Sequence, residues 1–378
     1  MTIAIISIIR EPWGGSEELW AQMALEALRQ NHKVIHLSYN TKTIHPKVQM
    51  LIHEGMIECH RPGFFPKNIN PIKKKIIIAI NYVKKQIKPP FKKIFSYHPD
   101  MVLYNGTCLS IVREKDLLQC LKKHDTTLHI LGHYFSDLEK NLSPSEMDDI
   151  IQLYQYAKRK FFVSLKSLEQ TQNFLSIKLE DSFVVRNPVN ISSIEKLPYP
   201  NNRTTQFAAV GILVCAHKGQ DILLDVLADE KWRQRDWHLN IYGEGEDENY
   251  LKTLSQKNQL ANKISFHGKV NDIRAVWEHN NILLMPSRME GMPLAVVEAM
   301  LCGRAVVATD VGGIPEWVRK NKDGFIAPSA TIEAFDTAME RAWEQKDNWQ
   351  QLGSNAHHRA IELYDPQAGK SLLNLISA

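Results

Sequence analysis

Residues 281–309 read NILLMPSRMEGMPLAVVEAMLCGRAVVAT, and this stretch decides the fold. It opens with an apolar run, NILLMP, that is typical of a buried strand, and it closes with a second such run, AVVAT. Between them PLAVVEAMLC predicts a helix, because Pro293 suits its first position and Gly303 follows as a C-terminal stop. A strand, a helix and a second strand in this order are the building unit of a parallel sheet.

The same alternation continues outward on both sides. In the C-terminal half it predicts strands at FAAVGIL, HLNIYG and ISFHG and helices at QDILLDVLAD, ENYLKTLSQK and DIRAVWEHN. In the N-terminal half, strand-like IAIISII leads through REPWGGS to the helix EELWAQMALEALRQN and then to the strand VIHL. We expect Ser16 to cap that helix, and the carboxylates of Glu17 and Glu18 suit the positive end of its dipole.

These patterns predict an α/β fold of two Rossmann-like, doubly wound domains that face each other across a cleft, with ligands at the carboxyl ends of the strands. The segment 197–206, LPYPNNRTTQ, is rich in Pro, Asn and Thr and is the predicted linker. We therefore expect an N-terminal domain over 1–196, a C-terminal domain over 207–360, and a final helix within 361–378 that packs back towards the N-terminal domain.

Length and composition exclude several classes of protein. The 378 residues suffice for two ordinary domains, and 44% hydrophobic with 23% charged residues is typical of a soluble globular protein. No apolar run approaches the roughly 18 residues of a membrane span, and MTIAIISIIR lacks the basic start of a signal peptide. Five scattered cysteines without CxxC spacing argue against disulfides or a zinc site and favour a reducing cytoplasm.

Positive charge is concentrated in one part of the chain. Between Cys59 and Pro99 there are ten Lys or Arg residues and no acidic residue. The tract over 71–93, PIKKKIIIAINYVKKQIKPPFKK, mixes lysines with apolar residues and predicts contact with an anionic membrane surface. A solvated helix face is the alternative. Nucleic acid is not an expected partner, because no recognition motif accompanies the charge.

The turn and helix at 286–303 carry the predicted chemistry. Backbone N–H groups of Gly291, Met292 and Leu294 should point out of the junction, where they can bind a phosphate or a sugar hydroxyl. Glu290 lies just before the helix, and Glu298 is the only charge within PLAVVEAMLC. A buried carboxylate needs donors, and the hydroxyls of a ribose would supply them.

This Glu-x7-Glu segment resembles the signature of the family-four retaining glycosyltransferases of GT-B fold. Further similar motifs occur in order: PWGGSEELW at 12–20, VVRNPVN at 184–190, HKGQDILL at 217–224, IYGEGED at 241–247 and FHGKVND at 266–272. The resemblance covers residues 205 to 345 closely and the N-terminal half only in patches. It implies a glycosyltransferase that moves a sugar from a nucleotide-diphosphate donor to a glycan or lipid-linked acceptor, as in bacterial cell-surface polysaccharide or glycolipid synthesis.

The resemblance also implies residue roles. Glu298 would hold the ribose, Glu290 the hydroxyls of the donor sugar, and Lys218 the diphosphate. Gly14 and Gly15 would let the backbone approach phosphate or acceptor. The backbone around Gly291, Met292, Pro293 and Leu294, and the positions Gly243, His267 and Gly268, would complete the donor site.

In the N-terminal half, His133 of LGHYFSD is implied to lie near the reacting sugar carbon. Each assignment has a structural alternative: a capped or ion-paired helix carboxylate for the two glutamates, a solvated loop lysine for Lys218, an ordinary turn for Gly14 and Gly15, and a packing residue for His133.

One departure from the family is apparent at Ile212, where the family often has an arginine that contacts phosphate. His217, Arg288 or Arg10 are the candidates to replace that cation. No Asp-x-Asp triplet and no metal-ligand spacing occurs, so we expect metal-independent, retaining transfer with no cofactor beyond the nucleotide-diphosphate sugar itself. The expected location is the cytoplasm, with peripheral membrane contact through 71–93. A sugar-nucleotide 2-epimerase and a non-catalytic nucleotide-sugar-binding protein of the same fold are the alternatives.

Overall fold

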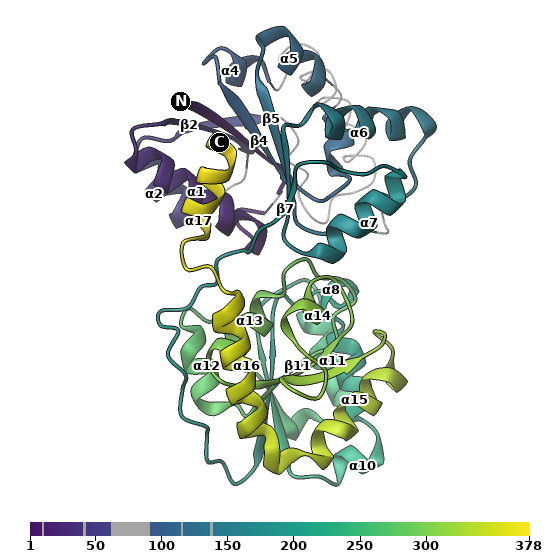
Figure 1. Ribbon diagram of the computed structural model, residues 1–378. Coiled ribbons are helices and arrows are strands. Elements are labelled where there is room, and N and C mark those ends of the chain that lie inside the picture. Colours follow the sequence, from purple (N-terminus) through teal and green to yellow (C-terminus); the bar gives the residue numbers. More distant parts are fainter. Residues whose placement is uncertain (10, 41–42, 62–90, 115, 137–138) are drawn as a thin grey trace. The chain divides into compact units, whose positions relative to one another are not determined.

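The computed structural model describes residues 1–378 except residues 10, 41–42, 62–90, 115 and 137–138. The chain divides into two compact units, unit 1 with residues 1–188 and 365–378 and unit 2 with residues 189–364. Each unit contains one parallel sheet with helices on both faces (Figure 1). The predicted α/β class with two doubly wound domains is confirmed.

Unit 1 is built on a seven-stranded sheet of order β3-β2-β1-β4-β5-β6-β7. Its strands are β1 (Thr2–Ser7), β2 (Lys33–Tyr39), β3 (Ile57–Arg61), β4 (Met101–Gly106), β5 (Thr127–Gly132), β6 (Arg159–Phe162) and β7 (Ser182–Val184). The order reverses at β1 and β4, which is the topological switch point of a Rossmann-like sheet. Residues Ile3 to Ile6 of β1 are fully buried, because helices cover both faces of a parallel sheet.

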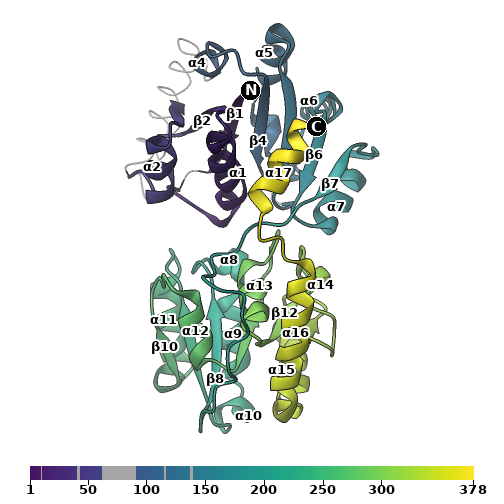
Figure 2. The same cartoon turned by 60° about the vertical axis from the view of Figure 1, so that its left-hand side comes forward.

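The helices of unit 1 come from both ends of the chain. They are α1 (Glu18–Arg29), α2 (Pro46–His53), α4 (Lys92–Phe95), α5 (Leu117–His124), α6 (Pro144–Tyr156), α7 (Leu165–Leu175) and α17 (Ala368–Ser377). The C-terminal helix α17 lies along α1 (Figures 1 and 2). Gly369 permits this approach, because a Cβ there would lie 2.5 Å from the carbonyl carbon of Gln22.

Unit 2 is built on a six-stranded sheet of order β10-β9-β8-β11-β12-β13. Its strands are β8 (Thr205–Val210), β9 (Trp237–Tyr242), β10 (Ile264–Phe266), β11 (Ile282–Met285), β12 (Ala305–Thr309) and β13 (Gly324–Ala327). Its helices are α8 (Cys215–Lys218), α9 (Gln220–Leu227), α10 (Glu230–Arg233), α11 (Glu248–Lys257), α12 (Ile273–His279), α13 (Leu294–Leu301), α14 (Ile314–Trp317), α15 (Ile332–Glu344) and α16 (Trp349–Leu363). The strand–helix–strand reading of 281–309 corresponds to β11, α13 and β12.

The predicted linker is wrong in position. Residues 197–206 belong to unit 2, and the division between the units falls after Pro188. The guanidinium of Arg304 donates to the carbonyl of Pro198 at 2.7 Å, and the amide of Asn281 donates to Pro200 at 3.2 Å. These bonds attach the segment to unit 2, so it resembles a linker in composition but does not act as one. At the other end α16 continues to Leu363, so the C-terminal domain reaches 364 rather than 360.

The predicted cap of the first helix is also wrong. A short 3-10 turn over Gly15–Glu17 precedes α1, and no side chain caps either element. The hydroxyl of Ser16 is directed instead to the carboxylate of Glu17, at 3.4 Å.

None of the helices in the described part of the chain is long and apolar enough to cross a membrane. The basic tract that predicts membrane contact, 71–93, lies outside the described residues up to residue 90. Its last three residues start at the buried Phe91 and lead into α4. Contact of this tract with a membrane stays a prediction.

Candidate functional site

In unit 2, the loops after β8, β9 and β10 are packed backbone against backbone. Gly243 takes a φ of +136°, and a Cβ there would lie 1.9 Å from the carbonyl oxygen of Gly211. The N–H of Gly243 donates to the carbonyl of Gly268 at 2.8 Å. His267 stacks on Tyr242 with ring centroids 4.5 Å apart. The predicted donor-site positions Gly243, His267 and Gly268 therefore lie together at the carboxyl ends of these strands.

The loop 286–293, between β11 and α13, is held between two glycines. A Cβ on Gly219 would lie 2.1 Å from the carbonyl oxygen of Pro286, and a Cβ on Gly312 would lie 2.0 Å from that of Glu290. Both glycines have positive φ, +65° and +51°, which side-chain-bearing residues rarely adopt. The sequence motifs predict no such role for either glycine.

Substitution of Gly219 by Ala is expected to displace this loop and to lower the free energy of unfolding by about 1–3 kcal/mol, the usual cost of a strained backbone. Denaturant unfolding measures the change. Gly14→Ala is the matched control, because Gly14 has an extended φ of −156° and its nearest neighbour is a flexible Ile9 methyl. Equal losses in the two variants would contradict the assigned role of Gly219.

The loop places Glu290 and Lys218 in contact. Nζ of Lys218 donates to Oε1 of Glu290 at 2.7 Å, and the hydroxyl of Ser287 donates to the same oxygen at 2.7 Å. The Glu290 side chain is only 6% exposed and that of Lys218 is 24% exposed. Two predicted site residues that are 72 positions apart in the chain therefore form one charged pair.

Three residues were candidates to replace the arginine that the family often has at the position of Ile212, and the structure bears on each of them. Arg288 binds both carboxylate oxygens of Asp221, at 2.6 and 2.9 Å, and donates to the carbonyl of Cys215. Its guanidinium is therefore engaged within unit 2. Arg10 lies outside the described residues, which leaves His217, on the short helix α8, of the three candidates. Ile212 itself is 52% exposed.

The start of α13 differs in one respect from the prediction. Pro293 is its N-cap rather than its first helical residue, and no side chain caps the helix. By helix geometry the N–H groups of Leu294 and Ala295 have no acceptor within the helix. Gly291 accepts from the N–H of Gly313 at 2.8 Å, which fixes the turn. Glu298 is 8% exposed in the second turn of the helix.

In unit 1, Gly14 and Gly15 form the turn into α1. Neither is among the residues of positive φ, and the carbonyl of Gly14 accepts from the N–H of Glu17 at 3.0 Å. Backbone conformation therefore does not require glycine at these two positions. Their role in approaching a ligand stays a prediction.

His133 follows β5 and is 4% exposed. Its Nε2 lies 2.7 Å from Oδ1 of Asn105, and Nδ2 of Asn105 donates to Oε1 of Glu17 at 2.9 Å. Glu17 is itself 2% exposed. Burial raises the pKa of Glu17 above its ordinary value, while nearby His36 and the hydrogen bonds from Ser7, Trp20 and Ser16 lower it. The sequence patterns predict neither Glu17 nor Asn105 as a member of this network.

Burial also lowers the pKa of His133 to about 3, so its imidazole is neutral at pH 7. A base whose pKa falls on folding takes up its proton more readily when unfolded, so acid favours the unfolded state. We expect stability to fall as pH drops below 6.5 towards 3, by about 1.4 kcal/mol per pH unit from this group. The free energy of unfolding, measured at pH 7 and pH 5, should therefore fall less in His133→Asn than in the wild type. An equal loss would contradict the assignment.

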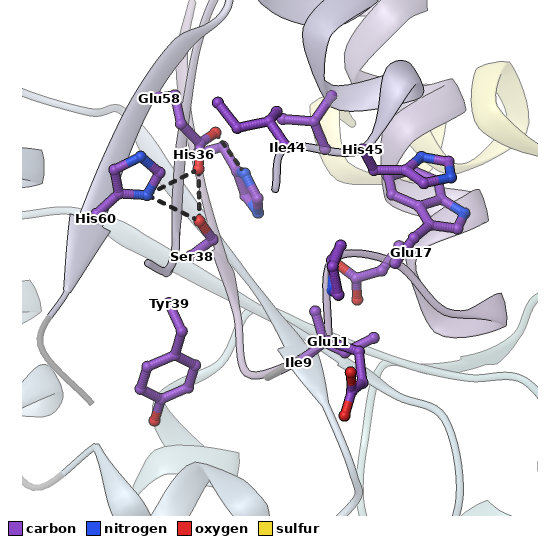
Figure 3. Close-up of a pocket in the computed structure, with 13 residues that line it drawn as sticks. Ile9, Glu11, Glu17, His36, Ser38, Tyr39, Ile44, His45, Glu58 and His60 are labelled. Carbon is purple, nitrogen blue, oxygen red and sulfur yellow. Dashed lines mark hydrogen bonds and ion pairs between the residues drawn. The ribbon is translucent and has the colours of Figure 1, made fainter. Parts of the chain in front are cut away.

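An open pocket lies in unit 1 near the ends of β1, β2 and β3 (Figure 3). Its lining residues are Ile9, Glu11, Pro12, Trp13, Glu17, His36, Ser38, Tyr39, Ile44, His45, Val48, Glu58 and His60. Glu58 accepts from Nδ1 of His36 at 2.7 Å and from the hydroxyl of Ser38 at 2.5 Å. Nε2 of His36 is buried without a hydrogen-bond partner. Aromatic, carboxylate and imidazole groups together suit a hydroxyl-rich ligand.

Metal-ligating side chains do not cluster in the part of the chain that is described. No group of three or more His, Cys, Asp or Glu residues there is arranged to hold a metal ion. The pocket of unit 1 thus has histidines and carboxylates within it but no metal-binding arrangement among its described residues.

Comparison with known proteins places these features in a family context. Residues 200–359 match the model of the family described as "Glycosyl transferases group 1". An uncharacterized glycosyltransferase of Haemophilus influenzae is 31% identical over 216 residues, 54% of this chain and 57% of that protein. A putative colanic acid biosynthesis glycosyltransferase of Salmonella typhimurium is 28% identical over 160 residues, 40% of this chain and 39% of that protein. The chain thus spans about half the length of these curated relatives.

A solved structure matches along the whole chain. The crystal structure of Anabaena HepE in complex with UDP has a TM-score of 0.74 and 18% sequence identity, and the match covers 100% of both chains. The lipopolysaccharide outer core galactosyltransferase WaaB, in its apo form, has a TM-score of 0.70 at 19% identity. At these identities the likeness shows the fold, which is the GT-B fold.

Proposed function

We propose that the protein transfers a sugar from a nucleotide-diphosphate donor to a glycan or lipid-linked acceptor, because residues 200–359 match the model of the glycosyl transferases group 1 family. The observation that carries the proposal is the contact between Lys218 and Glu290 beside the N-terminus of α13. A cation, a carboxylate and unpaired helix N–H groups in one place suit a ligand that combines phosphate with sugar hydroxyls.

The donor would bind along this set of residues. Lys218 and the N–H groups at the start of α13 face the diphosphate, Glu290 accepts from hydroxyls of the donor sugar, and Glu298 from those of the ribose. His267, Gly243 and Gly268 at the ends of β9 and β10 complete the site. That HepE was crystallised with UDP supports a uridine nucleotide as the first donor to test.

Transfer would proceed without a metal ion and with retention of the anomeric configuration. As the bond between sugar and diphosphate breaks, negative charge develops on the leaving phosphate, and Lys218 and the helix dipole stabilise it. The acceptor hydroxyl attacks the sugar on the face from which the diphosphate departs, and the proton of that hydroxyl passes to the departing phosphate oxygen. Glu290 orients the sugar in this mechanism and forms no covalent bond to it.

The acceptor would bind in the pocket of unit 1. The rings of Trp13 and Tyr39 offer apolar faces to a sugar ring, while Glu58 offers carboxylate oxygens to its hydroxyls. The similarity of this protein to a putative colanic acid biosynthesis glycosyltransferase supports an acceptor in cell-surface polysaccharide synthesis. A cytoplasmic protein that touches the inner membrane surface through 71–93 would meet such acceptors.

A non-catalytic nucleotide-sugar-binding protein is the second candidate, and Ile212 favours it. This side chain is 52% exposed at the position where the family often has a phosphate-binding arginine. A sugar-nucleotide 2-epimerase would use the same donor site but needs no acceptor.

The proposal is tested by incubating the full chain with UDP-, GDP-, ADP-, CMP- and dTDP-sugars in EDTA and measuring nucleotide release. Release of one nucleoside diphosphate together with free sugar is the expected result. Binding without release would favour the non-catalytic alternative, and a changed sugar on an intact nucleotide would favour the epimerase. Neither binding nor release of any donor would overturn the proposal.

A further inference from the structure

A buried series of hydrogen bonds runs from Glu17 through Asn105 to His133, and the donor and the acceptor of each bond can be assigned. Glu17 begins it at the wall of the unit 1 pocket (Figure 3), and its Oε2 accepts from the hydroxyl of Ser7 at 2.8 Å and from Nε1 of Trp20 at 2.9 Å. An indole nitrogen can only donate. The oxygen of Ser7 accepts from the N–H of Ile9 at 3.3 Å, so its own proton is available to Glu17.

The other carboxylate oxygen orients the amide of Asn105. Oε1 of Glu17 lies 2.9 Å from Nδ2 of Asn105, and an ionised carboxylate only accepts, so the NH₂ group of Asn105 must face it. The carbonyl oxygen Oδ1 of Asn105 then faces Nε2 of His133, at 2.7 Å. An amide oxygen only accepts, so Nε2 must carry the proton.

We propose that Glu17 and Asn105 are positioning residues that hold His133 in its Nε2–H tautomer, with Nδ1 left as a hydrogen-bond acceptor. His133 would then accept a hydrogen bond from a ligand hydroxyl and would not donate one. The tautomer follows from these hydrogen bonds with Glu17 ionised, the form that the donors Ser7, Trp20 and Ser16 favour. Its consequence for turnover rests on the proposed function, together with the place near the reacting sugar carbon that the resemblance implies for His133.

In the isosteric variant Glu17→Gln, donors and acceptors exchange places along this series of hydrogen bonds. Its amide oxygen is retained where the donors of Ser7 and Trp20 converge, so its NH₂ group faces Asn105. Asn105 must then turn its oxygen to residue 17 and its NH₂ group to His133. Nε2 of His133 becomes the acceptor, and the proton moves to Nδ1.

The test is the ¹⁵N NMR spectrum of the full chain labelled at histidine, at pH 7.5, with the His133 signals assigned by their loss in His133→Gln. A protonated Nε2 in the wild type and a protonated Nδ1 in Glu17→Gln are the expected results. Glu18→Gln is the matched control, because Glu18 binds Lys47 and Trp13 outside this chain of bonds, and its spectrum should match the wild type.

A wild-type spectrum with the proton on Nδ1 would overturn the proposal without any variant, and so would an unchanged tautomer in folded Glu17→Gln. Nucleotide release separates this inference from the proposed function. If this inference and the proposed function both hold, Glu17→Gln lowers the rate of nucleotide release about tenfold, the order expected for one reversed hydrogen bond. An inverted tautomer with unchanged release would leave the inference standing and remove His133 from the reaction.

Discussion

Lys218→Met is expected to slow nucleotide release at saturating donor by about 10²–10³-fold, the usual effect of removing one group that stabilises charge in a transition state. Lys218 is the cation that binds Glu290, which precedes α13 in the chain. Its loss leaves the charge of the leaving diphosphate to helix N–H groups. Steady-state assay of the donor identified in the release panel measures the change.

Lys231→Met is the matched control for this variant. Lys231 forms an ion pair of similar length, 2.6 Å, with Asp336 in the same unit. It precedes β9 and therefore lies towards the amino ends of the strands. Its loss should leave the rate unchanged, and Lys218→Arg should recover part of the activity. A wild-type rate for Lys218→Met would exclude Lys218 from the reaction.

Arg304→Met is expected to cost unit 2 about 3 kcal/mol or more, because it leaves several buried carbonyls without a donor. Arg304 is fully buried, and its guanidinium donates to the carbonyls of Pro198, Trp277, Asn280, Cys302 and Gly303. Four of these carbonyls belong to the C-terminal ends of α12 and α13, whose dipoles favour a cation there. Burial lowers the pKa of this guanidinium to about 10, still well above neutral pH.

Thermal unfolding is the measurement for Arg304, with a fall in Tm of roughly 6–12 °C expected for a unit of this size. Arg233→Met is the control, because Arg233 is exposed on α10 and its loss should change stability by less than about 0.5 kcal/mol. An unchanged Tm in Arg304→Met would show that Arg304 does not anchor the 197–206 segment.

The fold was predictable because the information lies in local patterns. Continuous apolar runs such as AVVAT at 305–309 mark strands buried on both faces of a parallel sheet, and β12 occupies those residues. The position of Gly303 after α13 was also predictable, since it takes the positive φ, +76°, of a helix C-terminus. The pattern could not place the domain boundary, because Arg304 and Asn281 hold the 197–206 segment from more than 80 residues away.

Contacts at the candidate site were predictable only where the resemblance covers the chain. Lys218 and Glu290 were named from motifs, and the structure brings them together. Gly219 and Gly312 were missed, because their importance depends on carbonyls of a loop that is distant in sequence. Glu17 was assigned to the helix dipole, whereas it also binds Asn105, which is 88 residues away on β4. No local pattern records such a contact.

The most direct test of a nucleotide site in unit 2 is calorimetric titration of the full chain and of Glu298→Ala with the nucleoside diphosphate that the donor releases. Loss of the hydrogen bonds between a buried carboxylate and ribose hydroxyls should weaken binding about 10–100-fold. A wild-type affinity in the folded variant would contradict the assignment of Glu298 and the placement of the ribose beside α13.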